Sequence, residues 1–177
     1  AEFAARAARD NPQIRSLTLI SPTGLMGRPP PGPKAQDRIE RVVRTPLLGA
    51  GLYRALTTRV SIRYFLRKAF YGPIPDGMVE YAMATTRQPG AEHAPFRFLS
   101  MRLFDADAVD NLYRQIEQPV LVLYDEDPNV GFERLPEVLA LSNWHGERIE
   151  PSRGMPHFEH PERTVEALTR FWAGLPA

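Results

Sequence analysis

The sequence contains no cysteine and only two lysines among its 177 residues. Without cysteine, the chain has no disulfide framework, no thiolate metal ligand and no cysteine nucleophile. Arginine supplies nearly all of the positive charge, and 22 basic residues against 21 acidic ones leave a formal net charge of +1. This balance argues against nucleic acid as a partner, because phosphate binding needs a concentrated basic surface.

Long hydrophobic runs are also missing. The longest apolar runs, such as Val120 to Tyr124, are far shorter than the roughly 20 residues that a membrane-spanning helix needs, and no stretch resembles a secretory signal. We therefore expect no membrane span and a cytoplasmic location. The location is only loosely constrained, because Ala1 to Arg9 has the pattern of a helix interior and suggests a missing upstream segment.

Helix and strand patterns alternate at both ends of the chain. Ala1 to Arg9 has small apolar residues at helical spacing, Asn11-Pro12 ends that helix, and Ile14 to Ile20 has the composition of a buried strand. Later patterns indicate a helix, a strand, a helix, a short strand and a closing helix, at Asp107 to Ile116, Val120 to Tyr124, Phe132 to Leu141, Glu147 to Glu150 and Glu162 to Trp172. This order predicts an α/β fold with a parallel sheet.

A helical insertion separates these two ends. The proline-rich stretch Gly27 to Pro33 can continue neither a helix nor a central strand, and the residues after it, to about Phe104, show helical patterns and hardly any strand signal. We therefore predict a core formed by residues 1–26 and 105–177, and a helical cap at residues 27–104. Large aromatic side chains are usually buried, so we expect those of the cap to form core rather than pocket: Phe65, Phe70, Tyr71, Tyr81, Phe96, Phe98 and Phe104.

Candidate catalytic residues follow the predicted strands. Parallel α/β sheets place ligands and catalytic groups at the carboxyl ends of their strands. Asp127 follows the strand Val120 to Tyr124, and His157 lies in the turn after the last strand. From these positions a carboxylate could accept the imidazole hydrogen and stabilise the protonated ring, so the pair could act as acid and base.

Several alternatives stay open at this point. An Asp-Pro after a strand is often only a turn or a helix cap, and Asp125 and Glu126 compete with Asp127 for the role of the acid. His157 alone is more often an ordinary, partly exposed histidine. A metal site formed by His157 and His160, with Glu159 nearby, is disfavoured because prolines bracket the pair in a loop.

The remaining histidines have no comparable setting. His160 could simply open the closing helix, and we interpret His93 and His145 as surface or packing residues. We expect neither a metal nor a cofactor.

The order of these segments resembles the C-terminal half of an α/β-hydrolase over almost the whole chain. The segments that carry the resemblance are Phe3-Ala4-Ala5-Arg6-Ala7-Ala8, Asn11-Pro12, Ile14 to Pro22, the helical insertion, Pro119 to Pro128 and Gly154 to Glu162. The resemblance implies that Asp127 is the acid after the seventh strand, that His157 is the base after the eighth, and that the insertion is a cap after the sixth. Asp125 departs from the pattern, since many relatives have glycine near that turn, and a slipped alignment would make Asp125 the acid.

The resemblance also implies a nucleophile that this sequence does not contain. In the family the nucleophile lies in a Gly-x-Ser-x-Gly type elbow, just before the helix that Ala1 to Arg9 resembles, and no such elbow occurs in the 177 residues. We therefore expect the nucleophile upstream of Ala1. We also expect an N-terminal portion of the same protein to be the partner that covers the open sheet edge at Ile14 to Ile20.

The expected function is that of a truncated hydrolase. A serine upstream would give a serine esterase with a catalytic triad, acting on a small or medium apolar ester, whereas an aspartate there would imply dehalogenase or epoxide hydrolase chemistry. The alternative is an inactive fragment or a non-enzymatic binding module of the same fold. In either case we expect no triad catalysis from this chain alone.

Overall fold

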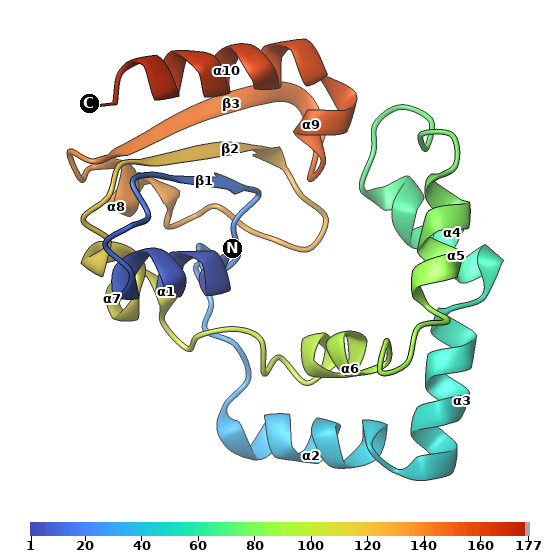
Figure 1. Cartoon of the computed structure of the whole chain (residues 1–177). Coiled ribbons are helices and arrows are strands. Elements are labelled where there is room, and N and C mark those ends of the chain that lie inside the picture. Colours follow the sequence, from blue (N-terminus) through green and yellow to red (C-terminus); the bar gives the residue numbers. More distant parts are fainter. Residues whose placement is uncertain (176–177) are drawn as a thin grey trace. The chain divides into compact units, whose positions relative to one another are not determined.

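The computed structural model describes residues 1–175, which form two compact units (Figure 1). The first, called the core unit below, consists of Ala1–Pro29, Ala69–Gly72 and the described residues from Asp105 onward. The second, called the helical unit, consists of Pro30–Lys68 and Pro73–Phe104. Each unit is built around its own buried side chains.

A parallel three-stranded sheet organises the core unit. The strands are β1 (Leu17–Ile20), β2 (Val120–Glu126) and β3 (Trp144–Arg153), in the order β1-β2-β3, with Val120 level with both Leu17 and Trp144. The α/β class and the parallel sheet that the sequence predicts are confirmed. Among the described residues β1 pairs with β2 alone, so its other edge has no strand partner in this part of the chain.

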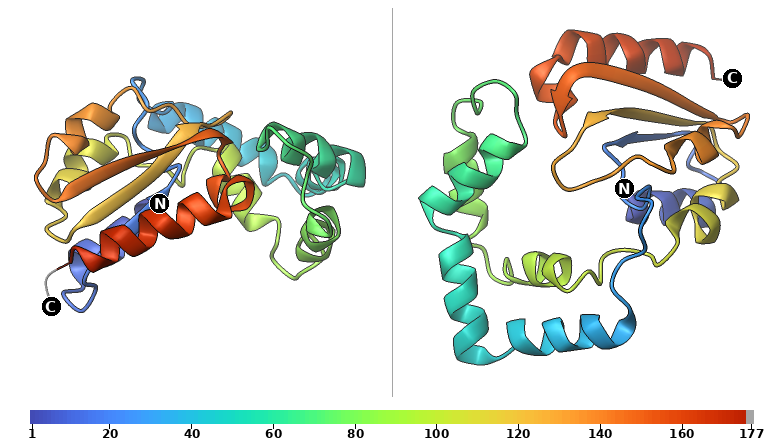
Figure 2. Two further views of the ribbon diagram at one scale, coloured as in Figure 1. Left: turned by 90° about the horizontal axis from the view of Figure 1, so that it is seen from above. Right: turned by 180° about the vertical axis from the view of Figure 1, so that it is seen from behind.

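Helices cover both faces of this sheet. Figures 1 and 2 show α10 (Pro161–Ala173) on one face, and α1 (Glu2–Asp10), α7 (Ala108–Asn111) and α8 (Leu135–Leu139) on the other. Because β2 lies between two covered faces, its first four residues are all buried, as is usual for a central parallel strand. Burying each such Val or Leu side chain contributes about 1.5–3 kcal/mol.

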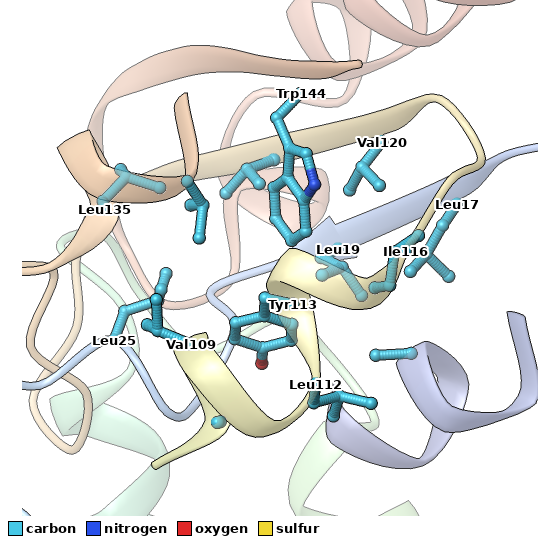
Figure 3. Close-up of a cluster of buried hydrophobic side chains, with 14 of the residues drawn as sticks. Leu17, Leu19, Leu25, Val109, Leu112, Tyr113, Ile116, Val120, Leu135 and Trp144 are labelled. Atoms are coloured by element: carbon cyan, nitrogen blue, oxygen red, sulfur yellow. The ribbon is translucent and has the colours of Figure 1, made fainter. Parts of the chain in front are cut away.

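The larger of the two apolar clusters lies on the face of α1, α7 and α8. In Figure 3 the rings of Tyr113 and Trp144 meet at its centre, with ring centroids 5.4 Å apart in an edge-to-face arrangement. Ala5 and Ala8 are fully buried where α1 approaches β1, which explains why that helix carries small residues. On the other face Leu123, Ile149 and Ala167 pack together beneath α10.

Several element boundaries differ from the sequence-based expectation. The helix expected at Phe132 to Leu141 is only α8, because Pro136 can stand in the first turn of a helix but not inside one. The helix expected at Asp107 to Ile116 is divided into α7 and a 3₁₀ turn at Tyr113–Gln115. The last strand, β3, extends well beyond Glu147 to Glu150, because most residues of this edge strand are at least partly exposed and polar side chains are tolerated there.

The helical unit contains α2 (Pro33–Val43), α3 (Pro46–Leu56), α4 (Arg59–Lys68), α5 (Met78–Thr85) and α6 (His93–Leu99). Proline stands at the first position of α2 and of α3, where its fixed backbone angle favours a helix start. The helical character expected of this region is confirmed. Its buried apolar side chains are few, namely Val43, Ile62 and Val79.

The expectation that the aromatic residues of this region form a core is wrong for most of them. Tyr81 is 73% exposed and Phe65 51%, and of the seven residues named above only Phe70 is buried. Phe70 itself lies in the short segment Ala69–Gly72, which belongs to the core unit. The helices are too short and too few to enclose all of their aromatic side chains, so Phe65, Tyr81 and Phe98 lie on the surface of the unit.

Candidate functional site

The three loops that the sequence singled out lie at one edge of the sheet. Strands β1, β2 and β3 are parallel, so the loops after Ile20, Glu126 and Arg153 all leave the same end. The first loop opens with Ser21, whose φ of 43° lies in the left-handed region and whose buried Oγ has no hydrogen-bond partner among the described residues. The other two loops carry Asp127 and His157.

Asp127 closes the turn after β2. Its Oδ1 accepts hydrogen bonds from the backbone nitrogens of Asn129, at 2.7 Å, and Val130, at 3.1 Å. This is the turn-forming role that an Asp-Pro pair often has. Its second oxygen, Oδ2, faces the backbone of Gly154 so closely that a Cβ built on that glycine would lie 2.7 Å away. Asp127 is therefore packed against the loop that leads to His157.

His157 lies on a single helical turn between two prolines. Gly154 has φ +83°, which lets the chain reverse after β3, and Pro156 then starts the short helix α9 (Pro156–Glu159). The Nδ1 atom of His157 is buried and has no hydrogen-bond partner within residues 1–175. Burial lowers the pKa of the imidazole below its ordinary 6.5, so the ring is neutral near pH 7. The structure contains no hydrogen bond between this nitrogen and Asp127.

Asp125, the competing acid, is held by structural contacts. Its Oδ1 accepts a hydrogen bond from Nε of Arg148 at 2.8 Å, and its Oδ2 accepts one from the backbone nitrogen of Ser152 at 2.7 Å. Only 3% of its side chain is exposed. Both oxygens thus join β2 to β3 beside the point where their register shifts between Tyr124 and Glu126.

Glu126 and Glu159 hold the segment Ala69–Gly72 against the core. Oε2 of Glu126 accepts the hydroxyl hydrogen of Tyr71 at 2.5 Å, and this hydrogen bond raises the pKa of Tyr71. Oε1 of Glu159 accepts hydrogen bonds from the backbone nitrogens of Tyr71, at 2.7 Å, and Gly72, at 3.4 Å. The other oxygen of Glu159 accepts one from the backbone nitrogen of Arg153 at 2.7 Å.

A metal site at His157 and His160 receives no support from this geometry. Nε2 of His160 lies 2.7 Å from the backbone oxygen of Pro151, and both oxygens of Glu159 are occupied by backbone donors. Between Ala1 and Leu175 no three histidine, aspartate or glutamate side chains are grouped closely enough to hold a metal ion.

The two other histidines lie elsewhere. The ring of His145 meets Phe171 edge-to-face at 5.9 Å, which is a packing contact. His93 lines a cavity of about 510 Å³ within the helical unit, together with Tyr53, Phe96 and charged residues of α2 and α3. None of the described helices is long and apolar enough to cross a lipid bilayer.

Several solved structures share the arrangement of strands and helices described above. No protein-family model and no curated protein sequence matches the chain. Among solved structures it resembles a membrane phospholipase A described as a bacterial virulence factor, with a TM-score of 0.64 and 23% identity over 98% of this chain and 54% of that one. It also resembles a serine hydrolase involved in carbazole degradation, with a TM-score of 0.64 and 16% identity over 96% of this chain and 58% of that one. A third similar structure is an α/β-hydrolase enzyme from a Medee basin deep-sea metagenome library. Its TM-score is 0.60, with 10% identity over 99% of this chain and 62% of that one.

The chain has the C-terminal part of the α/β-hydrolase fold. It spans just over half the length of the hydrolase chains that it matches. The resemblance to this fold that the sequence suggested is thus confirmed. The roles of Asp127 and His157 stay predictions.

The sequence patterns did not indicate the residues that hold the histidine loop in place. Phe70 is 3% exposed and meets Phe158 edge-to-face at 6.2 Å, while the guanidinium of Arg153 lies 4.6 Å above the ring of Tyr71. These contacts join residues more than 80 positions apart, so no local pattern could indicate them. The one available signal was the aromatic pair Phe70-Tyr71 directly after the end of a helical pattern.

Proposed function

We propose that this chain supplies the base and the acid of a serine hydrolase, with His157 as the base and Asp127 as the acid. The observation that carries the proposal is the buried Nδ1 of His157, which has no hydrogen-bond partner in the described part of the chain. A buried polar nitrogen without a partner is costly, so the site favours a carboxylate that accepts its hydrogen. Asp127 lies in the adjoining loop and packs against Gly154, three residues before His157.

Asp125 is the weaker candidate because its two oxygens already have partners. A move toward His157 would break the hydrogen bonds from Arg148 and Ser152 and leave the buried backbone nitrogen of Ser152 without its acceptor. Asp127, by contrast, uses Oδ1 for its turn and has Oδ2 on the side of the histidine loop.

The proposed reaction is hydrolysis of an ester. A serine hydroxyl attacks the carbonyl carbon while Nε2 of His157 takes its proton, and Asp127 stabilises the resulting imidazolium at Nδ1. The imidazolium gives that proton to the leaving alcohol as the C–O bond breaks. Water, deprotonated by the same ring, then releases the carboxylic acid and restores the serine.

The serine would come from an N-terminal portion of the same protein, in an elbow directly before α1. Two observations support this source: the sequence contains no Gly-x-Ser-x-Gly, and β1 pairs on one side only within the described residues. The similar structures include a serine hydrolase and a phospholipase A, which favours serine over the aspartate of a dehalogenase or epoxide hydrolase. The proposed substrate is a small or medium apolar ester.

The test compares this chain with a version that includes the residues encoded upstream. We expect the longer protein to hydrolyse p-nitrophenyl butyrate and the 177 residues alone to be inactive. His157→Ala and Asp127→Asn should each lower kcat/KM of the longer protein by about 10³–10⁴-fold. The matched control His145→Ala, at an exposed histidine that packs against Phe171, should change kcat/KM by less than about twofold.

Two outcomes would contradict the proposal. Esterase activity of the 177 residues alone, lost in His157→Ala, would show that the nucleophile lies inside this chain. A folded longer protein with no hydrolytic activity would favour the binding-module alternative.

A further inference from the structure

The net charge of +1 conceals a strong separation of charge between the two units. The helical unit has twelve Lys and Arg residues against five Asp and Glu, a formal charge of +7, while the core unit has ten against sixteen, a charge of −6. The whole-chain balance argued against nucleic acid as a partner, but it averages over two units of opposite charge. An anionic surface would therefore be attracted to the helical unit in particular.

Most of the exposed residues of α3 are apolar, with Arg54 as the charged exception. Leu47 is 88% exposed and Leu48 62%, and Leu52, one turn after Leu48, is also exposed. The helix buries only Gly49 fully, whose Cα lies against the backbone of Val43. Isolated exposed leucines are common on proteins, but three on one helix of a charged unit form an apolar strip that water solvates poorly.

The exposed side of α4 alternates apolar and basic residues. Val60, Arg63, Tyr64 and Arg67 follow one another at spacings of three, one and three residues, which places them on one face of the helix. Val60 is 81% exposed, and Ile62, on the opposite face, is the residue that α4 buries. The ammonium of Lys68 lies 4.5 Å from the centre of the Tyr64 ring, so the last turn adds another cation beside this face.

We propose that these faces of α3 and α4, with Leu47, Leu48, Val60, Arg63, Tyr64 and Arg67, form a peripheral binding surface for an anionic lipid membrane. Basic residues on the surface would pair with lipid phosphates, while the leucines, Val60 and the Tyr64 ring would enter the boundary between headgroups and acyl chains. Nucleic acid would satisfy the arginines but leave the leucines in water. No described helix can span a bilayer, so the surface would lie on the membrane.

The test is flotation of the 177-residue chain with vesicles of phosphatidylcholine alone or with 30% phosphatidylglycerol. We expect binding only to the anionic vesicles, weakened by raising the salt concentration. Removing two arginines in Arg63→Ser/Arg67→Ser should weaken binding about 30-fold, from about 1 kcal/mol for each basic residue near the surface. The matched control Arg38→Ser/Arg41→Ser removes the same charge from α2 and should weaken binding by less than about fivefold.

A second pair of variants tests the apolar contact. Leu47→Ser should weaken vesicle binding several-fold, whereas Val165→Ser, at an exposed valine of α10 in the core unit, should leave it unchanged. The proposal is overturned by any of three results: equal losses in the two arginine variants, no loss in Leu47→Ser, or equally tight, leucine-independent binding to duplex DNA. Circular dichroism of each variant checks that weaker vesicle binding does not result from unfolding.

Discussion

The carboxylate of Glu159 accepts a hydrogen bond from the backbone nitrogen of Tyr71 at 2.7 Å, although 88 residues separate the two in the sequence. Glu159 is the last residue of α9, the turn that carries His157. The same carboxylate accepts hydrogen bonds from the backbone of Gly72 and Arg153. One side chain therefore joins the end of β3, the histidine turn and the segment that follows α4.

Replacing Glu159 should loosen this junction. Glu159→Ala leaves three backbone N–H groups without their acceptor, and we expect the free energy of unfolding to fall by about 1–3 kcal/mol. Urea denaturation followed by circular dichroism measures the change. Glu117→Ala, at an exposed glutamate whose side chain has no hydrogen bond within residues 1–175, is the matched control and should shift the value by less than about 0.5 kcal/mol. Equal losses in the two variants would mean that the junction contributes nothing specific.

Asp125 should prove important for stability rather than for proton transfer. In Asp125→Asn one oxygen remains as acceptor, while the new amide group faces a donor, either Arg148 or the backbone of Ser152. We expect a loss of about 1–3 kcal/mol in the free energy of unfolding, because the buried amide group then faces a donor, the buried backbone of Ser152 or the exposed Arg148. Asp127→Asn keeps an oxygen for the Asn129 turn and should lose less than half as much. If Asp127→Asn were the more destabilising variant, the division of roles between the two carboxylates would be wrong.

The sequence predicted the strands and turns around Asp127 and His157 well, because these elements depend on local residue patterns. The apolar run at Val120 to Tyr124 is typical of a buried strand, and the glycine and prolines around His157 favour a turn and a helix start whatever lies nearby. Loops at the carboxyl ends of parallel strands then share one edge of the sheet. These constraints sufficed to place Asp127 and His157 in adjoining loops.

Hydrogen bonds between distant residues could not be predicted in the same way. Whether Asp125 or Asp127 is occupied depends on Arg148 and Ser152, which approach only after β2 and β3 pair. The exposure of Tyr81 likewise depends on how little apolar surface the neighbouring helices offer. The general tendency of aromatic residues to be buried gives no information about that surface. Composition averaged over the chain also hid the charge of the helical unit.

His157 should make the stability of this chain depend on pH. Burial lowers its pKa in the folded state below the ordinary 6.5, so the folded state binds fewer protons than the unfolded state on acidification. The free energy of unfolding should therefore be highest above about pH 6.5 and should fall as the pH drops from there toward the folded-state pKa. His157→Gln should lack this component, which urea denaturation of both proteins between pH 5 and 8 measures.

An NMR titration of the His157 ring protons gives the same answer independently. In this chain the midpoint should lie below 6.5. In the longer protein proposed above, an ionised Asp127 at Nδ1 would favour the imidazolium and raise the midpoint, and Asp127→Asn would lower it again. A midpoint at or above 6.5 in the 177 residues alone would show that the ring already has an anionic partner.

Gly154 provides the most direct test of the contact between the two loops. Gly154→Ala meets two obstacles, a φ of +83° and an alanine Cβ 2.7 Å from Oδ2 of Asp127. Gly77→Ala meets only the first, since its φ is +77° and no atom lies within 4 Å of the added Cβ. We expect Gly77→Ala to cost about 1 kcal/mol of unfolding free energy and Gly154→Ala about 2–3 kcal/mol, because the latter must also displace a carboxylate. Equal costs would mean that Asp127 moves aside freely, and a carboxylate that moves so easily would not be held in place to orient His157.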